Sequence, residues 1–321
     1  MGLTQALATS LSGLRATQTG LGIVAGNVAN AQTAGYVAQS VTQVASSSGD
    51  SGDGVRVSSI NRLLDTFVQQ QLRTETSGGS YADLNANFYQ QLLQVYGQPG
   101  SSTTFDSVFN NFTGAVQALA TSPNSPTAQG QAISAAQSLA SQLNSATASI
   151  QSMRSQADLG IAGDVQQANN ALSQIANINQ QLQTAADGDS ATALLEDQRD
   201  QYIDQLSKLM DIRVIASGRD QMTVFTASGT QLVGSQAAQL NFSPTGSISA
   251  AQQWNADPAK SGLGTLTLVT PGGASINLLA NGSIRSGEIA AYVNMRDNAL
   301  VQAQSQVDAI AAQMSSALSD T

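Results

Sequence analysis

Residues 136–182 read AQSLASQLNSATASIQSMRSQADLGIAGDVQQANNALSQIANINQQL, and this stretch decides the fold. Its apolar residues recur at spacings of three and four, the period that keeps them on one face of an α-helix. About fifty residues of helix measure about 75 Å at 1.5 Å per residue, so the pattern predicts a rod rather than a globule. The apolar positions are Ala136, Leu139, Leu143, Ala146, Ile150, Met153, Ala157, Ile161, Val165, Ala168, Leu172, Ile175, Ile178 and Leu182.

Residues 3–30 carry a second helical pattern with a narrower apolar seam. Four glycines interrupt this segment, each costing up to about 1 kcal/mol relative to alanine. We therefore expect the helix to be disordered in the free monomer and to order when it docks on another helix. The alternative is an ordinary core helix with loose packing. The seam repeats every seven residues, with further residues at offsets of four: Leu7, Leu14, Leu21 and Val28, then Leu3, Leu11 and Ala25.

Helical spacing also covers residues 61–96, where a break is expected at Ser77–Ser80, and residues 105–119, behind a cap at Thr103–Asp106. A turn at 187–190 leads into a helix over 195–209, with Asp204 and Lys208 expected as an exposed i,i+4 pair. From Ser286 a heptad pattern returns. We expect the helices before and after residues 211–286 to pack as an antiparallel coiled bundle.

Strand patterns occupy two places. Val55 and Val57 alternate with polar residues after the flexible turn at 49–54. Between 211 and 286 the period is two, with glycine, proline and asparagine turns, which predicts a small inserted antiparallel β unit. The expected fold is mainly α, a helical rod with this β insertion. Its divisions are an N-terminal segment over 1–50, a first rod part over 51–210, the β insertion over 211–286 and a return helix over 287–321.

The composition excludes several classes of function. The chain of 321 residues has no cysteine and no histidine, which removes thiol nucleophiles, the usual zinc ligands and a Ser-His-Asp triad. The net charge is −9, so the basic patch that nucleic acid requires is missing. Charged residues make up 10% of the chain, which leaves polar surfaces that cost little to desolvate. No cofactor or metal is expected, and the chain is predicted not to be an enzyme.

Neither a cleaved targeting peptide nor a membrane span is expected from the sequence. The first basic residue is Arg15, and polar residues interrupt every apolar run near the start of the chain. A stretch of about 20 apolar residues, which a membrane helix needs, does not occur. The chain is therefore either cytoplasmic or exported by a route that leaves its N-terminus in place.

Four short motifs resemble chemical sites, and each has a plainer interpretation. Gly49–Gly52 resembles a serine-protease motif, but no histidine is present to take the proton. Asp187 and Asp189 resemble the start of a calcium loop whose twelfth position holds Gln198 instead of glutamate. Gly262–Gly264 is too short for a phosphate site.

The fourth motif, Asp197-Gln198-Arg199-Asp200, is the densest charge cluster of the chain. On a helix, Asp197 and Asp200 share a flank and Arg199 points away. Paired carboxylates could in principle bind a metal or act in acid–base catalysis. With no cleft signal beside them, we expect a structural role in which Arg199 forks to a carboxylate across the bundle or on a neighbouring molecule.

Residues 27–36, Asn-Val-Ala-Asn-Ala-Gln-Thr-Ala-Gly-Tyr, resemble the Asn-Ile-Ala-Asn-x-x-Thr-x-Gly-Tyr signature of bacterial flagellar rod, hook and hook-associated proteins. Residues 10–16 and 20–21 are similar to the same group. Three further stretches resemble the family of flagellar hook-associated protein 1. These are Asn61–Phe67 with Gln71–Arg73, Asp197–Asp200 with Leu206–Leu209, and Ser286–Ile289 with Arg296–Asp297.

The resemblance implies a structural subunit at the junction between hook and filament, needed for filament assembly. It implies secretion through the flagellar type III path to the extracellular flagellum, without a cleaved signal peptide. Implied partners are copies of the chain, hook protein, the next hook-associated protein, the export apparatus and an export chaperone. The expected assembly interface comprises Leu7, Leu11, Leu14, Leu21, Asn27, Val28, Asn30, Gly35 and Tyr36, and the structural helix motif comprises Asp197, Arg199 and Asp200.

Two departures from the family pattern stand out. Glu196 occupies a position where the family has leucine, and nothing corresponds to the family's second terminal helix. We therefore expect the chain to be a fragment that ends before that helix. Two alternatives stay open: another axial protein, such as the hook or distal-rod subunit, and a type III-secreted helical effector or tip protein.

Overall fold

The computed structural model describes residues 2–33, 35–48, 51–97, 100–101, 104–185, 190–217 and 221–319. The expected turn at 187–189 and residues 49 and 50 of the Gly49–Gly52 motif lie outside the described residues. Contacts divide the chain into two compact units. Unit 1 comprises residues 1–76, 167–239 and 269–275, and unit 2 comprises residues 77–166, 240–268 and 276–321. The expected division along the chain into four segments stays a prediction.

The longest element confirms the opening pattern. Helix α4 runs from Pro126 to Thr184, 59 residues, and contributes to both units. The apolar positions of its stripe are buried from Leu139 to Leu182, with Ile150 and Ile161 both at 0% exposure. The alternation of three and four therefore predicted the buried face of this helix correctly.

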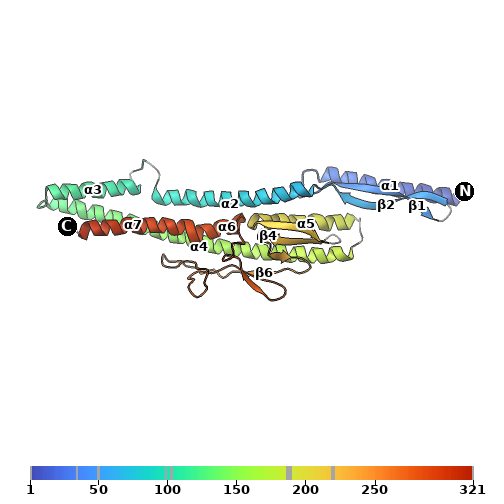
Figure 1. Ribbon diagram of the computed structural model, residues 1–321. Helices are drawn as coiled ribbons and strands as arrows, with labels where there is room; N and C mark the ends of the chain where they lie inside the picture. The colour runs from blue at the N-terminus through green and yellow to red at the C-terminus, as the bar shows by residue number, and fades with distance from the viewer. Residues whose placement is uncertain are drawn as a thin grey trace. The chain divides into compact units, whose positions relative to one another are not determined.

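Unit 1 begins with helix α1 (Leu3–Ala29), which runs beside a hairpin of β1 (Gln39–Ser48) and β2 (Ser51–Arg62) (Figure 1). The hairpin is antiparallel, pairing Gln39 with Arg62 and Val41 with Ile60. Strand β1 was not expected. Its register shifts between Thr42 and Gln43 and again between Ser46 and Ser47. Such bulges interrupt the strict alternation by which a strand is recognised in sequence.

The rest of unit 1 combines helix α5 (Ser190–Leu209) with a three-stranded meander. Its strands are β3 (Ile212–Ser217), β4 (Gln221–Thr226) and β5 (Gln231–Val233), in the order β3-β4-β5. β3 pairs with β4 from Ile212 opposite Thr226 to Ser217 opposite Gln221. Val224 and Leu232 are fully buried in this sheet, and Ile203 and Leu206 of α5 are fully buried as well.

Helix α2 corrects one expectation. It runs without interruption from Thr66 to Tyr96, so the break expected at Ser77–Ser80 is wrong. Ser77 is buried within the helix, and a Cβ atom at Gly78 or Gly79 would meet no neighbouring atom. The small residues at 77–80 are therefore compatible with a continuous helix. The division between the two units nevertheless falls between Thr76 and Ser77.

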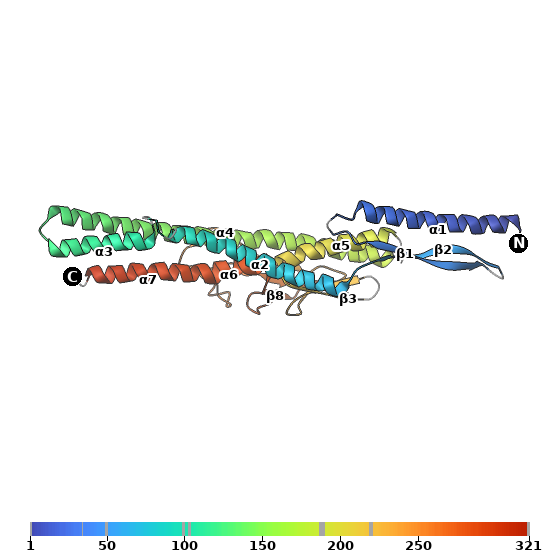
Figure 2. The same ribbon diagram turned by 90° about the horizontal axis from the view of Figure 1, so that it is seen from above.

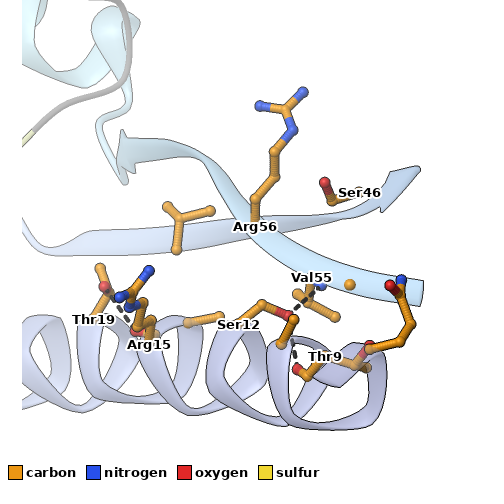
Figure 3. A pocket seen from close by; sticks show the side chains of 12 residues that line it. Thr9, Ser12, Arg15, Thr19, Ser46, Val55 and Arg56 are labelled. Carbon is orange, nitrogen blue, oxygen red and sulfur yellow. Dashed lines mark hydrogen bonds between the residues drawn. The ribbon is translucent and has the colours of Figure 1, made fainter. Parts of the chain in front are cut away.

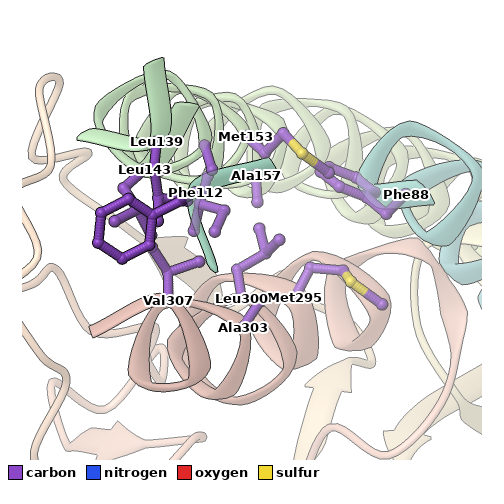
Figure 4. Packing of buried hydrophobic residues seen from close by; sticks show 12 residues of the cluster. Phe88, Phe112, Leu139, Leu143, Met153, Ala157, Met295, Leu300, Ala303 and Val307 are labelled. Carbon is purple, nitrogen blue, oxygen red and sulfur yellow. The ribbon is translucent and has the colours of Figure 1, made fainter. Parts of the chain in front are cut away.

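Unit 2 is a helical bundle built from the later part of α2, helix α3 (Phe105–Thr121), the earlier part of α4 and helix α7 (Leu300–Ser319) (Figures 1 and 2). Thr104 caps α3, where its Oγ1 accepts a hydrogen bond from the Ser107 amide at 3.2 Å. Figure 4 shows how α4 and α7 face each other across an apolar core. The core contains Phe88, Phe112, Leu139, Leu143, Ala146, Ile150, Met153, Ala157, Met295, Leu300, Ala303 and Val307.

A π-helical turn interrupts the return helix. Helix α6 (Gly287–Asn294) passes into η1 (Met295–Ala299), which leads directly into α7. A π turn holds more residues than an α turn. Met295 and Leu300, five residues apart, are consequently both buried in the core. The heptad pattern expected after Ser286, with Val293, Leu300, Val307 and Met314 seven residues apart, therefore continues through η1 with its register changed.

The remaining strands, β6 (Gln239–Asn241), β7 (Thr267–Val269) and β8 (Ser275–Asn277), form a sheet in the order β6-β7-β8. Strands within 211–286 were expected from four pairs that alternate with a period of two: Ile212/Val214, Met222/Val224, Leu266/Leu268 and Ile276/Leu278. Strands β3, β4, β7 and β8 overlap these four pairs. Strands β5 and β6 were not among the expected alternations.

Candidate assembly site

Helix α1 exposes the leucines of its apolar seam. The exposed fractions are 70% for Leu7, 55% for Leu14, 65% for Leu21 and 73% for Val28. Ala16 is the buried residue of this helix. The seam that predicted a buried contact thus faces away from the hairpin. Burying a leucine contributes about 1.5–3 kcal/mol, so a partner that covers this face would gain a large binding free energy.

Figure 3 shows the opposite face of α1, which borders the hairpin across a cleft of about 460 Å³. Ser12 makes the direct connection: its Oγ accepts a hydrogen bond from the Val55 amide at 3.2 Å and donates one to the Thr9 carbonyl at 2.8 Å. Gly54 lies close by, because a Cβ there would be 3.2 Å from Ser12 Oγ. Small and polar contacts, rather than apolar ones, hold α1 on the hairpin.

Residues 27–33 and 35–36 form the corner between α1 and β1, and Ala34 lies outside the described residues. Asn27 Nδ2 donates to the Gln39 carbonyl at 2.8 Å, and its Oδ1 accepts from Tyr36 Oη and from the Gln39 amide, both at 2.9 Å. Asn30 Nδ2 donates to the Gly26 carbonyl at 3.0 Å, at the end of the helix. These side chains are occupied within the chain, where they fix the direction in which α1 leaves the hairpin.

Gly35 completes this corner for a steric reason. Its φ is +81°, in the left-handed region that side-chain-bearing residues rarely adopt. A Cβ at this position would lie 3.0 Å from Cγ of Gln201 on α5. Glycine is therefore required both by the backbone turn and by the close approach to α5.

Two arginines join the start of α2 and the end of the hairpin to α5. Arg62 Nη2 lies 2.5 Å from Asp200 Oδ2, and Arg62 Nε lies 2.7 Å from Asp197 Oδ1 without the alignment of a hydrogen bond. Arg73 donates to the other Asp200 oxygen at 3.0 Å and to Asp204 at 2.6 Å. We call Arg62, Arg73, Asp197, Asp200 and Asp204 the arginine latch.

The electrostatics of the latch reflect its burial. Burial alone would lower the pKa of Arg62, but the charges of Asp200, Asp197 and Glu196 outweigh it and raise the pKa. Burial raises the pKa of Asp197 more than the nearby Arg62 lowers it. Removing one partner from such a buried network leaves an uncompensated charge and is strongly destabilising. The arginine latch is therefore expected to stabilise the fold only when all of its charged partners are present.

The structure places the predicted helix motif as follows. Asp197 and Asp200 share one flank of α5 and Arg199 points elsewhere, as predicted. Arg199 Nη1 donates to Oδ1 of Asn179 on α4 at 3.3 Å. Asn179 in turn donates to the carbonyls of Met222 and Gly234, both at 2.8 Å, and so ties α4 to the meander.

One pairing expected from the sequence is wrong. Asp204 was expected to pair with Lys208 one turn along α5, but it accepts a hydrogen bond from Arg73. Asn179 was missed altogether, because an asparagine within a long polar helix face carries no distinguishing signal. The latch itself joins Arg62 and Arg73 to α5 across more than 120 residues of sequence.

A second network of buried charges lies in unit 2. Arg296 in η1 pairs with Asp158 on α4 at 2.7 Å and with Asp297 at 2.7 Å, and the Arg296 and Asp158 side chains are fully buried. Arg154 donates to the carbonyls of Arg296 at 3.0 Å and Gln252 at 2.6 Å. Asp158 also accepts from the Thr245 amide at 2.6 Å. This network fastens the segment 245–252 to α4 and η1.

The Gly262–Gly264 motif also has a structural explanation. Gly264 is required for packing, because a Cβ there would meet the Ser243 carbonyl oxygen. Among the residues that the structure describes, no cluster of three or more histidine, cysteine, aspartate or glutamate side chains is placed to hold a metal ion. In the same part of the chain, no helix is both long and apolar enough to cross a membrane.

Long helices fastened by buried arginine–aspartate networks, with a leucine face left open, define a helical structural protein. A family model described as flagellar hook-associated protein FlgK helical domain matches residues 89–321. The chain belongs to this family of flagellar hook-associated proteins. The family is a structural one of the extracellular flagellum, whose members assemble with other flagellar components.

Individual relatives agree with the family match. Flagellar hook-associated protein 1 of Bacillus subtilis is 29% identical over 236 residues, covering 70% of this chain and 46% of the relative. That of Salmonella typhimurium is 28% identical over 245 residues, covering 74% and 44%. The chain thus spans somewhat under half the length of these relatives. The structure of the flagellar hook junction protein FlgK from Burkholderia pseudomallei matches with a TM-score of 0.60 and 26% identity, over 74% of this chain and 41% of that one.

Proposed function

We propose that this chain is a structural subunit that forms the junction between the hook and the filament of the bacterial flagellum and is needed for filament assembly. The observation that carries the proposal is the exposed leucine face of α1 in a chain of the hook-associated family. In a single molecule, this apolar face stays in contact with water. Neighbouring subunits that cover it gain the free energy of its burial.

We further propose that the partners are copies of this chain, hook protein and the next hook-associated protein. Residues 1–50 are the axial-core segment, and α1 meets its neighbours through Leu7, Leu11, Leu14 and Leu21. The corner residues Asn27, Asn30, Gly35 and Tyr36 support this contact by setting the direction of α1. Val28 extends the leucine face toward that corner.

In the free monomer, α1 is proposed to be labile. Support comes from its four internal glycines and from its polar, water-accessible contacts with the hairpin. Amide exchange measured by NMR on the monomer should find residues 3–29 weakly protected. Protection there as strong as in residues 139–161 of α4 would contradict the proposal.

Export is proposed to follow the flagellar type III path, without removal of a signal peptide and with the help of an export chaperone. A chain without disulfides and with a labile N-terminal helix suits a route that requires unfolding. N-terminal sequencing of the protein recovered from sheared flagella should begin at or beside Met1. A start after residue 20 would show that a leader is removed.

Deletion of the gene tests the function. Cells should retain complete hooks, lack filaments and lose flagellin to the medium. Loss of the hook as well would instead favour a hook or distal-rod subunit. Detection of the protein free in the medium, and not in purified hook–filament preparations, would favour a secreted effector.

Complementation links that phenotype to the leucine face. The double variant Leu14→Ser and Leu21→Ser should be produced and folded but should restore few or no filaments, because its seam can no longer be buried favourably. Gln18→Ala, at an exposed polar position of the same helix, is the matched control and should restore filaments fully. Full restoration by the double variant would remove the main support for the proposed interface.

A further inference from the structure

Asp164 is a buried carboxylate of unit 2 that belongs to neither arginine network. It lies on α4, is 5% exposed, and its Oδ2 atom has no hydrogen-bond partner. Burying an ionised carboxylate without a partner is costly, and proteins commonly avoid that cost by keeping the group protonated. The position contrasts with Asp158, which lies on the same helix and is fully paired.

Helix α6 sits very close to the stretch of α4 that carries Asp164. A Cβ at Gly160 would lie 2.5 Å from the ring of Tyr292, so only glycine allows this approach one turn before Asp164. Tyr292 also stacks edge-on against Phe88, with ring centroids 5.9 Å apart. The tyrosine ring therefore packs between α6 and α4 one turn from the buried carboxylate.

The groups that act on Asp164 electrostatically come from α6. Among the described residues, Glu288 in the first turn of α6 is the charged group whose field reaches Asp164, and it is acidic. Tyr292, one turn further, responds to both carboxylates: burial first, and then Asp164 and Glu288, raise its pKa. On α4 itself, the residues one turn from Asp164 on either side, Gly160, Ile161, Gln167 and Ala168, carry no charge.

Burial first, and the negative charge of Glu288 second, raise the pKa of Asp164 from 3.8 to about 7. A carboxyl group so placed changes its charge close to neutral pH. When it ionises, a second negative charge appears at a contact that already holds Glu288 and that the Gly160–Tyr292 approach keeps tight.

We propose that the contact between α4 and α6 in unit 2 is a proton-controlled clasp, tight when Asp164 carries a proton and weakened when Asp164 ionises. This goes beyond the proposed function and does not depend on it. The consequence for stability follows from proton linkage. The folded state binds this proton more tightly than the unfolded state, so stability is lost as pH rises from about 4 to about 7 and changes little above that.

Urea unfolding of the full chain tests the clasp. Trp254 is the single tryptophan of the chain and lies in unit 2, where its Nε1 donates to Thr265 Oγ1, so its fluorescence reports on this unit. Between pH 5 and pH 7 the unfolding equilibrium constant of the wild-type chain should rise by up to about tenfold per pH unit from this group. In Asp164→Asn that component should disappear, and the variant should exceed the wild type in stability at pH 8.

Matched variants separate the clasp from general acid effects. Asp83→Asn changes an exposed aspartate on α2 of the same unit and should keep the wild-type pH profile. Glu288→Gln keeps Asp164 but removes the repelling charge, so the midpoint of the pH profile should move to lower pH. Glu288→Gln also tests the proposed clasp if Asp164→Asn does not fold. A wild-type pH slope in Asp164→Asn, or an unmoved midpoint in Glu288→Gln, would overturn the proposal.

Discussion

Helices α1 and α4 carry the same kind of apolar repeat and use it in opposite ways. In α4 the repeat is buried inside the chain, down to 0% exposure at Ile150, whereas in α1 Leu7 stays 70% exposed. The difference lies in what faces each helix. The repeat of α4 meets aromatic and aliphatic residues of α2, α3 and α7, but α1 meets the hairpin through Ser12 and Ala16. A repeat thus shows that a helix has a face to bury, and not whether its own chain buries it.

The largest effect is expected from the buried charges that α4 has and α1 lacks. Asp158→Leu removes one of the two carboxylate partners of Arg296 and the acceptor of the Thr245 amide, which should cost about 3–5 kcal/mol in the free energy of unfolding. Urea unfolding followed by Trp254 fluorescence measures it. Arg15→Gln, at the charged position of α1, should change that value by less than about 0.5 kcal/mol. Equal losses of stability in the two variants would contradict the difference proposed here between the charges of α4 and the charge of α1.

The apolar repeats can be compared directly by shortening one residue in each. Ile150→Ala leaves a cavity in the core of unit 2 and should cost about 2–5 kcal/mol. Leu14→Ala shortens an exposed side chain and should leave monomer stability within about 0.5 kcal/mol of the wild type. The same urea experiment serves for both variants. A large loss in Leu14→Ala would mean that α1 packs on its own chain in solution.

The smallest effect concerns the attachment of α1 to the hairpin. Ser12→Ala removes the acceptor of the Val55 amide at the edge of the cleft between α1 and the hairpin, at a cost of about 1 kcal/mol or less. The loss should be local, so amide exchange at Val55 should accelerate while global unfolding hardly changes. Thr17→Ala, which alters a hydroxyl that bonds only within α1 through the Gly13 carbonyl, provides the comparison. Slower exchange at Val55 would contradict the role given to Ser12.

The sequence predicted what depends on local period. The buried stripe of α4, the common flank of Asp197 and Asp200, and the β insertion all follow from spacing. Other features depend on distant partners and could not be predicted this way. Arg62 and Arg73 appeared only as parts of a motif, and their aspartates lie on α5. The bulges of β1 concealed a strand, and the small residues at 77–80 suggested a break that α2 does not have.

The π turn at Met295–Ala299 makes this region sensitive to length as well as to composition. Its extra residue allows Met295 and Leu300 to point into one core. Without this turn, the same residues in a regular α-helix would turn every later side chain by about 100° around the axis and carry Ala303 and Val307 out of the core. Deleting Asn298, which is exposed, would let an ordinary α-helix form there and would keep the later side chains on their face, because Met295 and Leu300 would then stand four residues apart. Natural variants should therefore accept the loss of one residue in this segment more readily than the addition of one.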